Sequence, residues 1–442
     1  MSQIKYSPPW ADTSIIGVAG SSGSGKTSLA LEIVSSLNRP WVVILSTDSF
    51  YRSLTPAQSE RAFMNDHDFD SPDAIDFDLL VDRLRALKHG KKAEVPVYSF
   101  EKHQRLDKTT IIYSPSVLVL EGIFALFDPR VRDLLDMKIF AEADAETCLS
   151  RRILRDVKER GRDIEGVIKQ WFAFVKPNYE RYVGPQRNNA DIIIPRGIEN
   201  RVAIDMVVKH IRQMLNEKSK RHRDDLDWLG EQVGQDSLSD RVLLLSPAPQ
   251  LIAMSTIIQD HETDQEDFIF YFDRLVALLV ERALENTHFK ATTVRTPQGT
   301  HYHGLLPAGE ISAVVILRAG SAFETGLRRV IPDVRTGRVL IQSNIRTGEP
   351  ELHYLKLPGD IATHDSVLLL DPQMASGGAA LMAVRVLVDH GVPEDRIVFV
   401  TFVAGEIGLK RLCKVFPKLM VVVARVGEDW EERWVERRYF GC

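Results

Sequence analysis

The chain has 442 residues, of which 44% are hydrophobic and 26% are charged. At roughly 150 residues per domain, this length predicts two sizeable domains, each able to bury its own core. Lys and Arg number 56 against 61 Asp and Glu, which gives a formal net charge of −5. The chain therefore lacks the basic excess that favours a nucleic-acid partner.

Cysteine usage and hydropathy restrict the cellular compartment. Cys148, Cys413 and Cys442 are far apart and odd in number, which argues against a disulfide scaffold or a Cys-rich zinc site and favours a reducing compartment. The polar segment Met1–Pro9 is unlike a signal peptide, and no apolar run approaches the ~18 residues of a membrane helix. We expect a cytoplasmic protein that binds neither membrane nor nucleic acid; a nuclear location stays open.

Apolar runs alternate with helical patterns in the first half of the chain. Strands are expected at Ser14–Ala19, Trp41–Leu45, Val117–Leu120, Met137–Phe140 and Asp191–Ile194. Amphipathic helices are expected between them, at Ser28–Leu37, Asp78–Leu87 and Glu146–Glu159. Strands that alternate with helices predict an α/β domain around a mostly parallel sheet.

A glycine-rich motif directly follows the first expected strand. Residues 20–27 read GSSGSGKT, which fits GxxxxGK[ST] between a strand and a helix. The glycines let backbone N–H groups turn toward phosphate oxygens, and the helix that begins near Lys26 adds the positive end of its dipole. Lys26 can reach the terminal phosphates, and the Thr27 hydroxyl can bind Mg²⁺. A Gly/Ser-rich turn without a ligand is the alternative.

Two carboxylates follow other strands of the expected sheet. Asp48 comes just past the second strand, at the edge that faces the ligand crevice of an open α/β sheet. It could accept a proton from an attacking hydroxyl or hold Mg²⁺, and taken alone a helix N-cap role is equally open. Glu121 ends an apolar strand, in the position of the metal-binding acid of a Walker B motif.

Five arginines occur within twelve residues, at positions 151, 152, 155, 160 and 162. Guanidinium groups match phosphate geometry, so this segment predicts a lid over an anionic ligand. A solvated helix face is the alternative. The NKxD motif of guanine-specific switch GTPases is lacking.

Residues from about 14 to 216 resemble the uridine-cytidine kinase family of P-loop nucleoside kinases. The matching stretches are GSSGSGKTS, STDSFYR, DFDSPDAIDFDLL, PVYSFEKHQR, LEGIFAL, SRRILRDVKERGRD, FVKPNYE and ADIIIPRG. The resemblance implies transfer of the ATP γ-phosphate to the 5′-hydroxyl of uridine or cytidine, with Mg²⁺ as cofactor. Two positions depart mildly from the family pattern. Ser99 stands where the family usually has Asp, and Glu199 stands where it often has Asp.

The same resemblance implies roles for individual residues. Asp48 would take the 5′-hydroxyl proton, with Lys26 and Arg162 completing the catalytic set. ATP would be bound by Gly20, Ser21, Ser22, Gly23, Ser24, Gly25, Lys26, Thr27, Ser28 and Glu199, and Mg²⁺ by Thr27, Asp48 and Glu121. The nucleoside would be held by Asp70 at the ribose, by Tyr98 and His103 at the pyrimidine, and by Arg152, Arg162 and Gln170. A sugar diol suits a carboxylate acceptor, and a flat base suits an aromatic wall with a few polar groups.

The composition changes over residues 217–240, where four Lys or Arg and seven Asp or Glu stand among few apolar residues. This pattern predicts a solvated charged linker, although the Trp228-Leu229 pair indicates that part of it docks on a surface. Beyond it, Phe268–Leu284 is a strong amphipathic helix. Strand-like apolar runs then recur at Ala313–Leu317, Arg338–Gln342, Ser366–Leu370, Ile397–Phe402 and Leu419–Ala424. A second α/β domain over residues 241–442 is expected.

A second candidate phosphate site follows one of these later strands. Asp371 ends an apolar run and is followed by a loop with Ser376, Gly377 and Gly378. The N–H groups of such a loop can surround a 5′-phosphate while the acid takes ribose hydroxyls. Arg318 lies at another strand end, in a tight turn suited to pyrophosphate.

With the segment GEPELHYLKLP, these stretches resemble the uracil phosphoribosyltransferase family over residues from about 242 to 441. The implied ligand is phosphoribosyl pyrophosphate (PRPP). The family's phosphate loop reads like DPMLATGGS, whereas here Ser376 replaces Thr and Ala379 replaces the final Ser. Its glycine-rich closing segment, which reads uracil with its backbone, is replaced by acids and by bulky Trp430 and Trp434. We therefore expect a degenerate domain that binds PRPP, a nucleotide or a second copy of itself and does not convert uracil.

Three functions stay open at this point. The leading one is a uridine/cytidine kinase of pyrimidine salvage whose second domain regulates or oligomerises it. A bifunctional enzyme that also makes UMP from uracil and PRPP is one alternative. A non-catalytic nucleotide-binding regulator is the other, and the presence of Lys26, Thr27, Asp48 and Glu121 argues against it. The resemblance further implies a homo-oligomer and feedback by CTP or UTP, because both are common in the families concerned.

Overall fold

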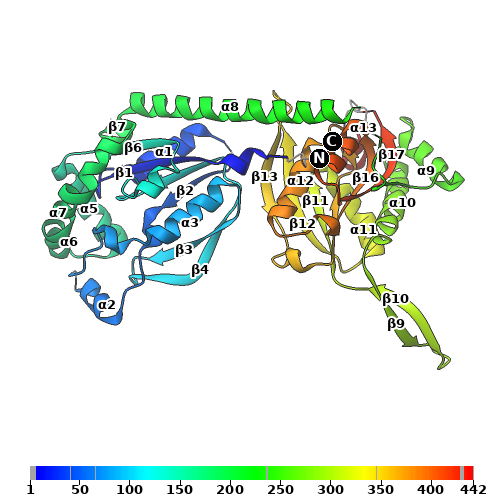
Figure 1. Cartoon of the computed structure of the whole chain (residues 1–442), viewed down its shortest axis with the longest axis horizontal. Coiled ribbons are helices and arrows are strands. Elements are labelled where there is room, and N and C mark those ends of the chain that lie inside the picture. The colour runs from blue at the N-terminus through cyan, green and yellow to red at the C-terminus, as the bar shows by residue number, and fades with distance from the viewer. Residues whose placement is uncertain are drawn as a thin grey trace. The chain divides into compact units, whose positions relative to one another are not determined.

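A computed structural model of the chain describes residues 6–39, 41–64, 66–234, 237–344, 346–428 and 433–441, and at 159 and 160 it describes the backbone alone. The chain divides into two compact units. The first is Pro9–Ser219, and the second comprises the residues before Pro9 together with those after Ser219. Each unit is an α/β structure built on its own sheet (Figure 1), which confirms the expected class of fold.

A five-stranded parallel sheet forms the centre of the first unit. Its strands, in sheet order, are β2 (Val42–Ser46), β5 (Val117–Glu121), β1 (Ser14–Gly20), β6 (Met137–Glu142) and β7 (Ile192–Pro195). The register pairs Ile16 of β1 with Val119 on one side and with Met137 on the other. All five predicted strands are present. Because they are parallel, their carboxyl ends and the residues that follow share one edge of the sheet.

Both faces of this sheet are covered, which explains why its strands are almost continuously apolar. Ile16 and Val18 of β1 pack in one core with α1 (Lys26–Leu37) and the early turns of α8 (Arg201–Val233). The alternating residues Ile15 and Ala19 pack in a second core with α3 (Phe77–Lys88). Successive side chains of a strand point to opposite faces, so each helical layer receives every second residue.

Shorter elements complete the first unit. The remaining helices are α2 (Pro56–Phe63), α4 (Pro129–Arg132), α5 (Ala145–Arg160), α6 (Ile164–Gln170) and α7 (Lys176–Asn178). An antiparallel hairpin, β3 (Ala93–Ser99) and β4 (Gln104–Ile112), comes between α3 and β5 in the chain. The apolar runs did not predict this hairpin, because β4 is largely exposed.

The charged segment 217–240 is mostly helical, so the expectation of a solvated linker is wrong for most of its length. Helix α8 continues without interruption to Val233, and the boundary between the two units, after Ser219, falls within it. In its later turns Leu226, Leu229 and Val233 are buried in the second unit, whereas Trp228 is half-exposed. These buried residues recur at helical spacing, a stripe that the many charges between them obscure in the sequence.

A larger sheet forms the centre of the second unit. In sheet order its strands are β13 (Pro350–Lys356), β12 (Arg335–Ser343), β11 (Ile311–Leu317), β14 (Ser366–Leu370), β16 (Ile397–Gly405), β17 (Met420–Gly427) and β8 (Val242–Leu244), and the short β15 (Gln373–Met374) also pairs with β16. The pairings are parallel except for that between β12 and β13. The five predicted runs correspond to β11, β12, β14, β16 and β17.

Helix α10 (Gln265–Leu284) covers one face of this sheet, as its amphipathic pattern predicts. Phe268, Phe272 and Leu275 of α10 are fully buried in one core with residues of β11, β14 and β16. The other helices are α9 (Pro249–Gln259), α11 (Glu324–Val330), α12 (Gly378–Asp389), α13 (Glu406–Val415) and α14 (Val435–Phe440). The hairpin of β9 (Phe289–Arg295) and β10 (His301–Pro307) extends away from the sheet of this unit (Figure 1).

Neither membrane-spanning helices nor reactive thiols are found in the described part of the chain. Among those residues, no helix combines the length and the hydrophobicity needed to cross a bilayer. Cys148 and Cys413 are free and buried. Burial raises the pKa of both thiols, that of Cys413 to about 11, so both are protonated at neutral pH. Cys442 lies outside the described residues.

Candidate active site

The glycine-rich motif forms a tight loop between β1 and α1. Gly23 and Gly25 have φ angles of +86° and +89°, in a left-handed region that favours glycine. A Cβ on Gly23 would collide with the backbone oxygen of Cys148, so a larger residue does not fit there. The serines buried in the loop are Ser21, Ser22 and Ser24. Lys26 is the first residue of α1, which gives the strand–loop–helix context that a phosphate-binding loop requires.

Thr27 and Glu121 bring oxygen atoms together beside this loop. Thr27 Oγ1 donates to Glu121 Oε2 at 3.0 Å, and Glu121 is buried at the end of β5. Asp48 lies in a short 3₁₀ helix, Thr47–Phe50, that follows β2. Ser46 caps that helix, because its Oγ accepts from the backbone N–H of Asp48, so the N-cap alternative for Asp48 is wrong. The hydroxyl of Thr27 at the start of α1 and two carboxylates at the ends of neighbouring strands are the type of oxygen ligand that Mg²⁺ prefers.

A cavity beside the loop is lined by half of the site residues predicted for this unit. It encloses about 640 Å³ of empty space, part of which is open to solvent. Of the residues predicted from the sequence, it is lined by Ser22, Lys26, Asp48, Asp70, Tyr98, His103, Arg152, Arg162 and Gln170. The predicted catalytic and nucleoside-binding side chains therefore meet in one place.

Aromatic rings form one wall of this cavity. The rings of Phe69 and His103 stack with their centroids 5.2 Å apart, and those of Tyr51 and Tyr98 are also 5.2 Å apart. The buried Tyr98 hydroxyl has no hydrogen-bond partner among the residues that the structure describes, so a bound ligand can supply one. Burial, and then the charge of Asp48, raise the pKa of Tyr98 to about 12. The hydroxyl is therefore protonated and able to donate at neutral pH.

The Asp70 carboxyl faces the same cavity with its side chain 15% exposed. Burial raises its pKa, and the positive charge of Arg152, 3.8 Å away, opposes that rise. Asp68 fixes the loop before it: Oδ1 accepts from the backbone N–H of Asp70 at 2.9 Å, and both carboxylate oxygens accept from Asn178 Nδ2 at 2.9 and 2.8 Å. The loop that carries Asp70 is thus held in place from the α7 side.

Sequence reasoning missed part of this site. It did not single out Asp68 or Asn178, which are 110 positions apart and share no local pattern. The cavity wall also includes Tyr51, His67, Phe69, Phe100, Ile123 and Phe174, which the sequence analysis did not single out, beside Arg155 of the predicted arginine lid. Most of these lie within the stretches that resemble the kinase family, and membership of such a stretch is the signal that could have found them.

The arginine-rich segment faces into the cavity. Arg152 is 6% exposed, and its Nη1 donates to Ser22 Oγ of the phosphate loop at 3.1 Å. Arg162 Nη1 donates to Oε1 of the buried Gln170 at 3.1 Å. The alternative of a solvated helix face therefore does not describe Arg152 or Arg162. The side chain of Arg160 lies outside the description.

Of the ten residues predicted to bind ATP, Ser22 and Lys26 line this cavity and the other eight do not, among them Glu199 and Ser28. Glu199 follows β7 with its side chain 64% exposed, and its Oε1 lies 3.5 Å from Arg151 Nη2. Ser28 is exposed in the first turn of α1. Both are close in the chain to elements that pack beside the phosphate loop, and their roles stay predictions.

The small-residue loop of the second unit lines a separate cavity with about 940 Å³ of empty space. Asp371, Ser376, Gly377 and Gly378 all line it, as predicted. Asp371 is 1% exposed, and its Oδ2 lies 3.5 Å from Arg433 Nη2. Its Oδ1 has no hydrogen-bond partner among the described residues. Burial raises the pKa of this carboxyl, and Arg433 opposes the rise.

Arg318 does not join this second cavity. Its side chain is 74% exposed, and its Nε lies 3.4 Å from Glu436 Oε1. Helix α8 instead supplies lining residues, namely Arg223, Leu226 and Asp227. The segment that was expected to be a linker is therefore part of the wall.

The residues that replace the family's glycine-rich closing segment are only partly described. The backbone N–H of Trp434 donates to Gln373 Oε1 at 2.9 Å. Its ring packs against Phe268 and Phe402, with centroids 6.0 and 6.2 Å apart. Trp434 is thus a partly buried residue that packs against the core, and Trp430 lies outside the described residues.

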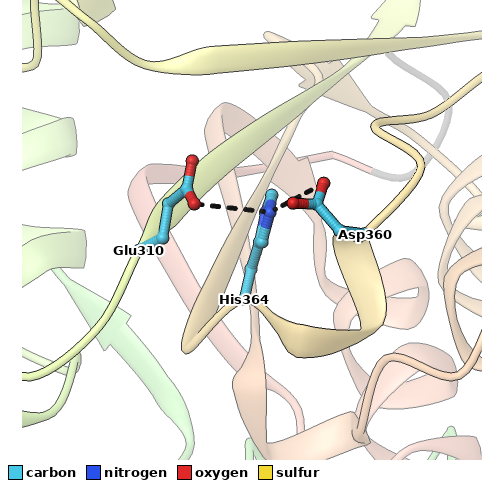
Figure 2. A group of neighbouring side chains, drawn as sticks. All are labelled: Glu310, Asp360 and His364. Carbon is cyan, nitrogen blue, oxygen red and sulfur yellow. Dashed lines mark ion pairs between the residues drawn. The ribbon is translucent and has the colours of Figure 1, made fainter.

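A third group of ionisable side chains lies elsewhere in the second unit. Figure 2 shows the buried His364 between Glu310 and Asp360, with His364 Nε2 3.8 Å from Glu310 Oε2 and 3.3 Å from Asp360 Oδ1. The guanidinium of Arg335 binds both carboxylates, and its contacts with Asp360 are 2.9 and 3.0 Å. Because this cation already pairs with both carboxylates, we interpret the cluster as an ion-pair network at the start of β11 and β12 and not as a metal site.

Comparison with known proteins shows similarity over both units. A family model described as "Phosphoribulokinase / Uridine kinase family" matches residues 15–203, and one described as "Uracil phosphoribosyltransferase" matches residues 245–435. Uridine-cytidine kinase-like 1 of Mus musculus is 45% identical over 95% of this chain and 77% of its own length. Uridine kinase of Schizosaccharomyces pombe is 43% identical over 99% of this chain and 97% of its own. Uridine kinase of Saccharomyces cerevisiae is 40% identical over 99% and 90%.

Proposed function

This chain belongs to the uridine kinase family, and from that premise we propose that the cavity of its first unit phosphorylates the 5′-hydroxyl of uridine and cytidine. The protein is a phosphotransferase that uses ATP. One observation supports the choice of this cavity above others: Lys26, Asp48 and Asp70 line it together beside an aromatic wall. A phosphate-binding lysine, a proton acceptor and a ribose-binding carboxylate are the groups that such a transfer needs.

In this proposal the nucleoside is held at both ends before transfer. Asp70 accepts hydrogen bonds from the ribose hydroxyls, and the Tyr98 hydroxyl and the His103 ring hold the pyrimidine. Asp48 accepts the proton of the 5′-hydroxyl as that oxygen attacks phosphorus. Lys26 and Arg162 stabilise the negative charge that spreads over the oxygens of the transferred phosphoryl group. ADP and the nucleoside monophosphate are the products.

Thr27, Asp48 and Glu121 are the magnesium ligands that we propose. Their fit is supported by the hydroxyl of Thr27, 3.0 Å from a carboxylate oxygen of the buried Glu121 beside the phosphate loop. When bound with ATP, magnesium neutralises charge on the β- and γ-phosphates. The backbone of residues 20–28, with Glu199 nearby, is the proposed ATP-binding segment.

For the second unit we propose a regulatory or oligomer-forming role. The unpartnered Oδ1 of Asp371 and the loop with Gly377 and Gly378 provide an acceptor and a cradle for a phosphoribosyl group. PRPP, or CTP or UTP as feedback effectors, has this chemistry. Conversion of uracil is not part of the proposal, because Arg433 already contacts Asp371 and Trp434 packs against the core.

The experiment that tests the kinase proposal is ADP release by the whole chain with ATP and either uridine or cytidine. We expect release that depends on the nucleoside and is lost in Lys26→Ala, because the phosphate-binding cation is removed. Lys92→Ala is the matched control, since Lys92 is exposed and is not among the residues that line the cavity. Absence of nucleoside-dependent ADP release from the unmodified chain would contradict the proposal.

A further inference from the structure

One fully buried carboxylate, that of Asp156 on α5, contacts three arginines at once. Its Oδ1 accepts from Arg155 Nε at 2.8 Å. Its Oδ2 lies 3.2 Å from Arg162 Nη1 and 3.7 Å from Arg152 Nε. The three arginines line the substrate cavity, and Asp156 lies behind them. The Asp156 side chain can therefore influence the substrate cavity only through the arginines that it contacts.

The backbone of Asp156 fixes the same region. Its carbonyl accepts from the N–H of Gly161, which ends α5 at a left-handed φ of +62°, and from the N–H of Arg162 at 3.1 Å. This turn directs Arg162 back toward helix α5. One residue thus sets both the path of the chain before Arg162 and the direction of its guanidinium.

Two of these arginines connect separate parts of the site. Arg152 donates to Ser22 Oγ of the phosphate loop and lies 3.8 Å from Asp70. Arg162 donates to Gln170. Cations gathered in a partly buried cavity repel one another and lose hydration. Burial lowers the pKa of Arg162, and the negative charge of Asp156 opposes this change.

We propose that Asp156 is a positioning residue for phosphoryl transfer, which holds Arg152 and Arg162 in the orientation that the transferred phosphate requires. The proposal rests on the kinase function proposed above. Its physical basis is that a stabilising cation acts in the transition state only when it is held in place beforehand, so a small displacement lowers the rate more than it lowers substrate binding.

The first test is Asp156→Asn, which keeps the shape of the side chain and removes its charge. We expect kcat with uridine to fall by about 10- to 100-fold, while KM for uridine changes by less than about threefold. Glu146→Gln is the matched control, because Glu146 is exposed on the same helix and loses the same charge. Wild-type kcat in Asp156→Asn would overturn the proposal, whereas an inactive wild-type chain would overturn the kinase function itself.

A double-mutant cycle separates positioning from a general loss of structure. Arg162→Ala alone is expected to lower kcat/KM. If Asp156 acts through Arg162, adding Asp156→Asn to Arg162→Ala should cost less than Asp156→Asn costs by itself, because one of the two residues that it positions is already gone. Losses that multiply fully would overturn the proposal. If Asp156→Asn does not fold, Asp156→Glu decides: it keeps the charge but moves it by one methylene, and a folded variant with wild-type kcat would contradict the proposal.

Discussion

Asp48 occupies the position where a proton acceptor is useful, at the carboxyl end of β2 and in the lining of the substrate cavity. Ser46 caps the local helix, so the Asp48 side chain is not needed for that purpose. Its charge is one of the causes that raise the pKa of Tyr98, which indicates that the two side chains are electrostatically close. The role proposed for Asp48 is therefore a property of this single residue and can be tested on it.

We expect Asp48→Asn to lower kcat by about 10²–10⁴-fold, the range typical of lost proton transfer. Uridine affinity should be kept, because Asp70, Tyr98 and His103 are unchanged. Steady-state kinetics and calorimetric uridine binding measure the two quantities, with the exposed Asp107→Asn as control. Near-normal turnover would contradict the assignment, and recovery of kcat with added magnesium would assign the loss to metal binding instead.

Asp70 provides a prediction with a definite pH dependence. Burial raises the pKa of its carboxyl above the ordinary value of 3.8. The folded state therefore holds the proton more strongly than the unfolded state, and stability is lost as the pH rises from 3.8 through the raised pKa. Asp70→Asn should be more stable than wild type at pH 7, and this gain should shrink as the pH falls toward 4.

The same variant should bind its substrate less well. Loss of a charged acceptor for the ribose hydroxyls should raise KM for uridine by about 10- to 100-fold. Thermal unfolding at several pH values and uridine kinetics check the two halves of this prediction. Asp73→Asn, three residues away and exposed, is the control. If Asp70→Asn were less stable than wild type at pH 7, the ionised carboxylate would stabilise the fold, which would contradict the prediction.

At the scale of single elements, helix α8 is more than a connection between the two units, because residues of its later turns are buried in the second unit. Its His222 is 4% exposed and uses both ring nitrogens: Nε2 lies 3.0 Å from the Tyr6 hydroxyl and Nδ1 lies 2.8 Å from Glu349 Oε1. Burial, and then the charge of Glu349, raise the pKa of Tyr6, so its hydroxyl stays protonated. This cluster joins the chain start, α8 and the loop before β13 within the second unit.

We expect His222→Ala to destabilise the second unit by about 1–3 kcal/mol, because the buried groups of Tyr6 and Glu349 each lose a hydrogen-bond partner. The measurement is the midpoint of the corresponding transition in denaturant or in calorimetry. His210→Ala on the same helix is the control, since His210 is exposed. Equal midpoints for the two variants would show that the cluster does not hold α8 in place.

At the scale of the whole molecule, the two units retain different parts of their family patterns. The first has Ser22 and Lys26 of the phosphate loop, the proposed proton acceptor Asp48 and an aromatic wall in one cavity. The second has a phosphate-type loop and Asp371, but Arg433 contacts that acid, and Arg318 is directed to Glu436. We therefore expect activity to come from the first unit alone.

The whole chain should release no pyrophosphate above background from uracil and PRPP, because a pocket for uracil built from glycine backbone is lacking in the sequence. ADP release with uridine and ATP in the same preparation serves as the positive control. Clear uracil-dependent release of pyrophosphate would contradict this prediction and favour the bifunctional alternative.

Strands, motifs and family stretches could be predicted from the sequence because each is a local pattern. All strands of the first sheet, and β11, β12, β14, β16 and β17 of the second, were located by apolar runs, since buried parallel strands have little choice of residue. The runs did not predict β8, β13 or β15. The loop from Gly20 to Thr27 was recognisable because its glycines, lysine and hydroxyl have fixed spacing. Asp48, Asp70 and His103 followed from stretches in the right order, and the structure places all three on one cavity.

Tertiary structure alone decided which distant residues meet. The pairing of Asp68 with Asn178, the contact of Arg433 with Asp371 and the burial of His222 on Glu349 join residues 110, 62 and 127 positions apart. The helical course of residues 217–233 was hidden as well, because its buried stripe is stabilised by packing in the second unit and not by its own composition. Local sequence therefore determined the type and place of most elements. Which residues from distant elements come into contact was decided only by the packing of the folded chain.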